Sequence, residues 1–263
     1  MTFHPGKCKV LPVTLQRNIL DNLPFNIFWY ELNGTIIDYV TSHTDLGVNV
    51  NTRSTWGPHC DTLVAKATTK LAILKRTCHF TTNQRQKRAF YLAIVRSLLE
   101  HCSVIWAPQY ANHINKFAAV QKRAVKWILG DQFESYSDEE FDQKQRCLNI
   151  LPVKLKFIYN DLIMFYKIVN GLVPVSLPEY ITIIQPEDTR YTRNNAAIHN
   201  LTDRSRYHCN VSVNNDIFKN SFFCRVIRSW NSLPEDVRQA GRISLFKPLL
   251  LGCVWSSDIV WPD

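Results

Sequence analysis

The spacing of hydrophobic and polar residues changes near Trp56. Before it, apolar runs are short, and the early stretch KVLPV predicts a strand. The run FWYELNGTIIDYV carries Asn33-Gly34 between two apolar stretches, which is typical of the tight turn of a β-hairpin. Leu46–Val50 predicts one further short strand. The residues before Trp56 are therefore expected to be rich in β structure.

From Trp56 onward, apolar residues recur every three or four positions, which is the period of a helix with one buried face. The pattern predicts three helices: one within residues 59–80, a second over 83–102 and a third over 112–129. Gly130 follows the third helix and is expected to cap its C-terminus. In the second helix the residues expected to face inward are Phe90, Tyr91, Ile94, Val95, Leu98 and Leu99.

The second half of the chain predicts two more helices separated by a polar stretch. Residues 155–171 are apolar on most sides, which indicates a buried helix that stops at Gly171. Residues 187–215 are rich in Asn, Arg and Thr and are expected to be loops with a short strand. A last amphipathic helix is expected within 220–234, with Arg225 and Arg228 facing outward and these residues buried: Phe222, Phe223, Val226, Trp230 and Leu233. The predicted fold is α+β and mainly α.

Composition narrows the class of protein. A chain of 263 residues with 46% hydrophobic content can bury a sizeable core. It contains no uninterrupted apolar run of about 18 residues and no apolar leader at its start, so we expect neither membrane insertion nor secretion, and a location in the nucleus or cytoplasm. The eight cysteines are scattered without a Cys-x-x-Cys pair and are expected to be reduced.

The positive charge is concentrated in one quarter of the chain. The net charge is +9, yet residues 66–126 hold twelve Lys or Arg residues and a single acid, Glu100, so the remainder is slightly negative. A basic block of this kind favours a polyanionic partner, with nucleic acid ahead of an anionic membrane surface. An acidic patch follows it, made of Asp131, Glu134, Asp138, Glu139, Glu140 and Asp142, and is read as a solvated face.

The helix over 112–129 is expected to turn its cations away from the core. At about 100° per residue, its apolar residues cluster on one side. Lys116, Lys122, Arg123 and Lys126 share the other side, and Trp127 borders them. Such a ring could stack on a nucleobase, or it could pack against a neighbouring helix beneath an ordinary solvated surface.

Motifs for catalysis are missing from the sequence. It has no Gly-rich phosphate loop, no nucleophile elbow and no His-Glu-x-x-His. Cys78-His79 and His101-Cys102 carry ligand types that suit zinc, but adjacent residues on a helix point about 100° apart, so buried cysteines beside ordinary histidines are the favoured interpretation. No metal site is expected.

Ten short motifs, in order, resemble the C-terminal part of reverse transcriptases from non-long-terminal-repeat retrotransposons, the LINE-type and jockey-like elements. The resemblance covers nearly the whole chain and rests on KCKVL, YELNG, DLGV, WGPH, KA, LKRT, YLAIVRSLLEHCSVIWAP, VQKRAVKWILG, LNILPVKLKFIYNDLIMFYKIVNG and SFFCRVIRSWNSLP.

The resemblance implies three regions. Residues 1–55 would be the end of the palm, 56–131 a basic, helical, thumb-like region, and 132–263 a helical C-terminal extension with a loop-rich stretch at 187–215. In the family, paired aspartates of the palm hold two metal ions for nucleotidyl transfer. This sequence has no Asp-Asp pair, so no catalytic residue is expected in it and Mg²⁺ is expected only in a full-length polymerase that includes an upstream palm and fingers.

The expected activity is therefore binding of an RNA or DNA template-primer duplex, through phosphates and without polymerisation. The expected contact residues are Lys66, Lys70, Lys75, Arg76, Lys116, Lys122, Arg123 and Lys126, with Trp127 as a stacking residue. Two alternatives stay open. The chain could be a domesticated protein-interaction module that uses the acidic patch with Trp255 and Trp261, or part of a gene whose palm is encoded just upstream.

Overall fold

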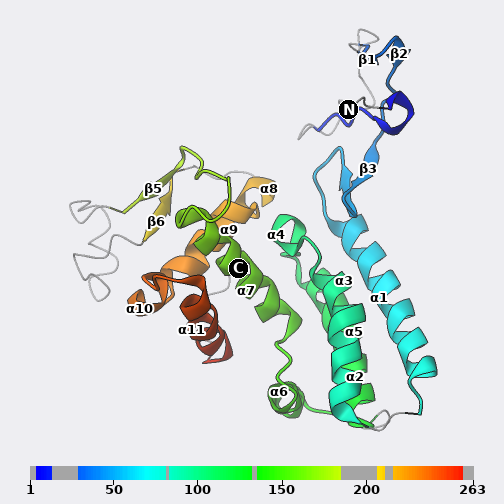
Figure 1. Ribbon diagram of the computed structural model, residues 1–263, viewed down its shortest axis with the longest axis vertical. Helices are drawn as coiled ribbons and strands as arrows, with labels where there is room; N and C mark the ends of the chain where they lie inside the picture. Colours follow the sequence, from blue (N-terminus) through cyan, green and yellow to red (C-terminus); the bar gives the residue numbers. More distant parts are fainter. Residues whose placement is uncertain are drawn as a thin grey trace.

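The chain folds into helices with a few short β-hairpins (Figure 1). The computed structural model describes residues 4–13, 29–80, 83–131, 135–184, 206–210 and 216–256. Of these described residues 59% are helical, and the strands form three two-stranded antiparallel sheets. The expected fold, α+β and mainly α with an N-terminal hairpin, is confirmed.

Two hairpins precede the first long helix. Strand β1 (Glu31–Leu32) pairs with β2 (Thr35–Ile36), and the turn between them places Asn33 and Gly34 at φ of 53° and 75°, as an Asn-Gly turn requires. Strand β3 (Ser42–Asp45) pairs with β4 (Val48–Asn51), which confirms the strand expected near Val50. The strand predicted in KVLPV is reduced to a single bridge between Val10 and Tyr39, after one helical turn, η1 (Pro5–Lys7).

The first group of helices follows the predicted boundaries closely. It contains α1 (Gly57–Thr77), α2 (Gln84–Phe90), the π-helical η2 (Tyr91–Arg96), α3 (Ser97–Glu100), α4 (Ser103–Trp106) and α5 (Ala111–Leu129). The side chain of Asn83 accepts hydrogen bonds from the first turn of α2, and Gly130, at φ 87°, caps α5. These caps explain why the start of α2 and the end of α5 could be predicted from the sequence.

The π-helical segment η2 changes which residues of the second predicted helix face the core. Tyr91, Val95 and Leu99 are completely buried, as expected. Phe90 and Ile94, which were also expected to be buried, are 37% and 39% exposed. The wider turn of η2 brings positions four apart into line, so the buried side follows 91, 95 and 99, and Phe90 and Ile94 rotate outward.

The second group of helices surrounds the end of α7. It contains α6 (Asp138–Cys147), α7 (Val153–Val169), α8 (Asp216–Lys219), α9 (Phe222–Asn231), α10 (Glu235–Arg238) and α11 (Ile243–Ser256), with strands β5 (Ile181–Ile183) and β6 (Tyr207–Cys209). Ser137 and Glu140 form a reciprocal capping box that fixes the start of α6. Of the polar segment 187–215, the structure describes only residues 206–210, and the rest of that prediction lies outside the described residues.

Helix α7 takes part in two hydrophobic cores. Its first turns, at Val153 and Phe157, pack with α1, η2 and α5 around Trp106. From Ile158 onward its buried residues pack with α9 and α11 around Trp230. The two cores therefore meet inside α7, whereas the resemblance places a regional boundary at residue 131. No helix in the described part of the chain is both long and apolar enough to cross a membrane.

One expected surface residue is in fact buried at the junction between the groups. Arg225 on α9 was expected to face outward, but it is only 4% exposed. Its Nε and Nη2 donate to the carboxylate of Asp161 on α7 at 2.7 and 3.1 Å, and Nη2 also donates to the carbonyl of Val104 at 2.5 Å. A carboxylate 64 positions away in the sequence makes this burial favourable. Arg228 is exposed, as predicted.

Candidate nucleic-acid interface

Three of the expected cationic residues lie along the contact between α1 and α5. The two helices lie side by side, with Ala67 and Leu71 of α1 buried in the same core as Phe117 and Ala124 of α5. Lys75 of α1 neighbours Arg123 of α5, and Lys116 of α5 pairs with Asp61 of α1. We call these three cations the seam cluster: Lys75, Lys116 and Arg123.

Within the seam cluster, Lys75 of α1 and Arg123 of α5 are like charges held near each other. Lys75 is half-buried, and its pKa is lowered from 10.5 by burial first and by the charge of Arg123 second. No acidic partner of either side chain is present among the described residues. An anion placed between them would relieve this repulsion.

Lys116 extends the seam cluster toward the start of both helices. Its Nζ lies 2.5 Å from Oδ1 of Asp61 on α1, and both side chains are about half exposed. The hydrogen bond from Lys116 lowers the pKa of Asp61, and the ring of His113 lies 4.0 Å from the same carboxylate oxygen. An exposed pair of this kind contributes little to stability, so Lys116 can exchange Asp61 for another anion at small cost.

Lys122 and Lys126 lie on the opposite flank of α5, beside α6. The Nζ of Lys122 is 5.4 Å from the ring centre of Phe141, and that of Lys126 is 5.4 Å from the ring centre of Tyr136. Lys144 of α6 lies 4.4 Å from the ring of Tyr136 as well. Cation–π contacts therefore hold these lysines against the surface, next to the seam cluster but on another side of the helix.

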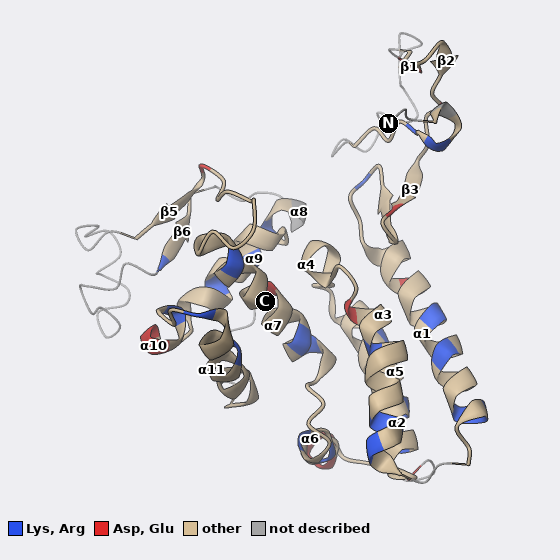
Figure 2. Cartoon of the chain, viewed as in Figure 1, with Lys and Arg blue, Asp and Glu red and all other residues tan. Residues whose placement is uncertain are grey.

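The remaining expected residues on α1 are exposed but do not join the seam cluster. Lys66 lies two turns after His59 on α1, and its charge helps to lower the pKa of His59, after the larger effect of burial. Lys70 follows Lys66 by about one turn, and Arg76 points to the outer side of the helix. Figure 2 shows Lys and Arg recurring along α1 and at the lower end of α2 and α5.

Trp127 does not lie on the basic surface. It is 2% exposed, because its side of α5 is covered by α2. Lys87 of α2 places its Nζ 5.7 Å from the indole ring and 3.3 Å from the carbonyl oxygen of Trp127. The ring is thus part of the core, and the expected role in stacking on a base is wrong for this structure.

Two other cations of the basic block have structural partners that the sequence did not reveal. Arg88 donates to the carbonyl oxygens of Leu148 and Asn149, at 2.5 and 3.0 Å, just beyond the end of α6. Arg96 is buried and bonded to Glu100 and to Gln121. The count of positive residues in the sequence therefore overstates the charge that this region presents to a partner.

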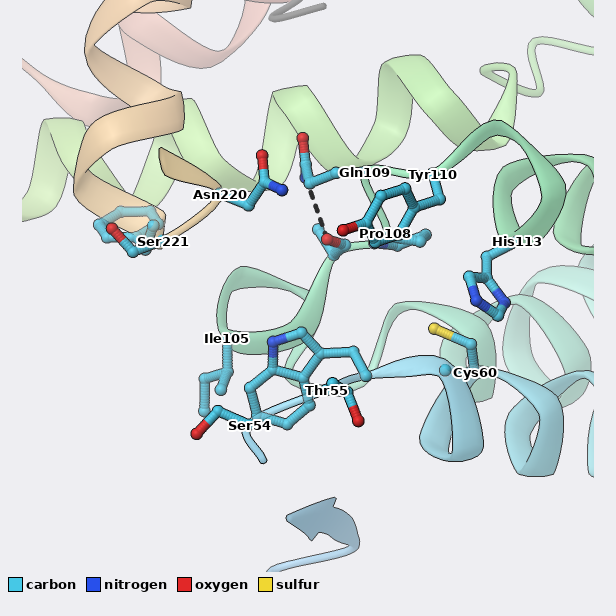
Figure 3. Close-up of a pocket in the computed structure, with 14 residues that line it drawn as sticks. Ser54, Thr55, Cys60, Ile105, Pro108, Gln109, Tyr110, His113, Asn220 and Ser221 are labelled. Carbon is cyan, nitrogen blue, oxygen red and sulfur yellow. Dashed lines mark hydrogen bonds between the residues drawn. The ribbon is translucent and has the colours of Figure 1, made fainter. Parts of the chain in front are cut away.

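A pocket of about 240 Å³ lies near the N-terminal ends of α1 and α5. It is bounded by the first turn of α1, the α4–α5 connection and the start of α9 (Figure 3). Its wall is mostly apolar, and Gln109 donates to the carbonyl of Ala107 at one edge. Burial raises the pKa of the Cys60 thiol to about 12, so this thiol stays protonated at neutral pH. Such a lining suits a small apolar group better than it suits nucleophilic catalysis.

The histidines considered for zinc are used elsewhere. The Nδ1 atom of His79 lies 2.8 Å from the carbonyl oxygen of Arg76, and Nε2 of His101 lies 3.0 Å from that of Leu46. In the portion of the chain that the structure describes, no three His, Cys, Asp or Glu side chains come together in a way that could hold a metal ion.

The candidate site is therefore a cationic surface formed by α1 and α5. Comparisons with protein-family models, with curated proteins and with solved structures found no match for this chain.

Proposed function

We propose that this chain is a fragment of a retrotransposon RNA-directed DNA polymerase that lacks the catalytic aspartates and retains binding of the template-primer duplex. The observation that carries the proposal is the Lys75–Arg123 pair, two cations brought together from α1 and α5 with no acidic partner among the described residues. The resemblance of the ten sequence motifs supports the identity of the element.

The physical argument concerns phosphates. Keeping the half-buried Lys75 close to the exposed Arg123 costs free energy, and a phosphate that contacts both would recover it. Lys116 and Arg123 are two turns apart on one side of α5, about 10 Å, so the seam cluster can follow a backbone over more than one phosphate. Contacts of this kind fix the position of a duplex and carry little preference for sequence.

Neutralising the pair tests the proposal. In the variant Lys75→Gln/Arg123→Gln, we expect affinity for an RNA–DNA duplex at physiological salt to fall by about tenfold or more. The slope of log affinity against log salt should become shallower by about two units, because two fewer counterions are released. Fluorescence anisotropy with a labelled duplex, repeated across a salt series, measures both quantities.

The matched control is Lys219→Gln/Arg228→Gln, which removes the same charge from two exposed positions on α8 and α9. It should leave the salt slope almost unchanged. If both double variants lost the same affinity for the duplex, only the net charge of the protein would matter, and the proposed interface would be rejected.

The low pKa of Lys75 gives a second prediction. An anion raises the pKa of a bound lysine, so the complex takes up protons and its affinity should decrease as the pH rises toward 10.5, the usual pKa of lysine. Lys75→Arg keeps the charge at every pH tested, so the decrease attributable to this residue should disappear. Anisotropy titrations between neutral pH and that value provide the measurement. Identical pH profiles for the two proteins would contradict a phosphate contact at Lys75.

The alternative proposal is a protein-interaction module. The structure gives its two features local roles: Glu140 of the acidic patch completes the capping box of α6, and Trp255 lies under Arg146 with 5.0 Å between the guanidinium carbon and the ring centre. Trp261 lies outside the described residues. A salt-insensitive protein complex, together with no affinity for duplexes, would favour this alternative.

A further inference from the structure

Two cysteine thiols meet where β6 packs on α9. The Sγ atoms of Cys209 on β6 and Cys224 on α9 are 3.4 Å apart, and both side chains are partly buried. The backbone around them is fixed by hydrogen bonds. Asn231 of α9 accepts from the amide of Tyr207 at 3.1 Å and donates to the carbonyl of the same residue at 2.7 Å. The pairing of Ile181 with Cys209 adds a second restraint on the strand.

We propose that Cys209 and Cys224 form an oxidation site, which a low-molecular-weight disulfide such as oxidised glutathione converts into an intramolecular disulfide. The proposal does not depend on nucleic-acid binding. It departs from the expectation, drawn from their scattered positions in the sequence, that all eight cysteines are reduced.

The chemistry balances through two exchange steps. The thiolate of one cysteine attacks a sulfur of oxidised glutathione, the bond between the two glutathione sulfurs breaks, and one reduced glutathione leaves. The thiolate of the other cysteine then attacks the protein sulfur of this mixed disulfide and releases the second glutathione. The protein loses two protons and two electrons, and the reagent gains them.

The geometry favours the second, intramolecular step. A disulfide bond is about 2.05 Å long, so the two sulfur atoms have only about 1.4 Å to close. Because Asn231 already holds β6 against α9, little chain entropy remains to be lost before the second thiolate attacks. A mixed disulfide with glutathione should therefore be short-lived at either cysteine.

The new bond would join residues 15 positions apart and tie β6 to α9. A cross-link of that span restricts the unfolded chain, and for a protein of this size we expect the melting temperature to rise by about 5–10 °C. A thiol reductant should return the melting temperature completely to its original value.

Oxidation of the full chain tests the proposal. The protein is incubated with oxidised glutathione, its remaining thiols are alkylated, and its peptides are mapped by mass spectrometry. We expect one linked peptide pair that contains Cys209 and Cys224, no retained glutathione on either residue, and a melting temperature that rises on oxidation. Cys60 and Cys78, both buried, should be recovered as free thiols that react only after unfolding.

Single variants separate the pair from general thiol reactivity. In Cys209→Ser the thermal shift should vanish, and Cys224 should be found free or carrying a stable glutathione; Cys147→Ser, at an exposed position, should behave like the natural sequence. If Cys209→Ser proves unstable, peptide mapping of the natural sequence alone decides. Glutathione adducts without the 209–224 link, or a link to another cysteine, would overturn the proposal.

Discussion

Replacing Asp161 with asparagine should lower the free energy of unfolding by about 3–5 kcal/mol, because it leaves the Arg225 guanidinium buried without its counter-charge. The two side chains are 8% and 4% exposed, so water cannot replace the lost partner. The carbonyl oxygens of Val104 and Asn220 would still accept hydrogen bonds from Arg225, but neither carries a negative charge. Urea denaturation followed by circular dichroism measures the change.

The control for this prediction is Asp236→Asn, an equivalent change at an exposed position on α10, which should alter stability by less than about 1 kcal/mol. Replacing both partners, as Asp161→Leu/Arg225→Met, should restore much of the lost stability, because no buried charge remains. A loss below about 1 kcal/mol in Asp161→Asn would show that the pair is hydrated in solution.

Truncating Trp106 to alanine should cost about 3–5 kcal/mol of the free energy of unfolding. The indole is completely buried at the centre of the first core. It stacks on Phe117 and meets Phe157 edge-on, each with 5.6 Å between ring centres, and its Nε1 donates to the carbonyl of His101 at 2.8 Å. Removal would leave a cavity and an unpaired carbonyl group together.

Trp29→Ala is the matched comparison, because that tryptophan is 73% exposed. Its substitution should change stability by no more than about 0.5 kcal/mol. If the two tryptophan variants unfolded at the same urea concentration, the packing of α4 against α5 and α7 described above would be incorrect.

Sequence periodicity predicted the long helices whose apolar residues keep one period, but it missed α6 despite the capping box of Ser137 and Glu140. Helix α5 was placed to within one residue because its apolar residues keep one period and Gly130 ends it. Helix α11 was missed, since it is apolar on most sides and contains Pro248 in its interior. The π-helical turn at η2 was missed for a different reason. Nothing in a 3.6-residue pattern marks the one place where the helix widens.

The sequence predicted which residues of the candidate interface are positively charged, but not how they are arranged in space. The sequence identifies which residues are positive, but Lys75 and Arg123 become neighbours only after α1 packs on α5. Likewise the burial of Arg225 depends on Asp161, and the burial of Trp127 on α2, and neither partner is adjacent in the chain. Single-helix reasoning assigns a polar residue to water whenever its partner lies on another element.

Because α7 supplies side chains to both hydrophobic cores, neither half can melt without withdrawing packing from the other. Heating should therefore produce a single calorimetric peak whose van't Hoff and measured enthalpies agree. A cleavage engineered within α7 should make the two enthalpies differ. Each fragment would then keep only part of the helix that completes both cores.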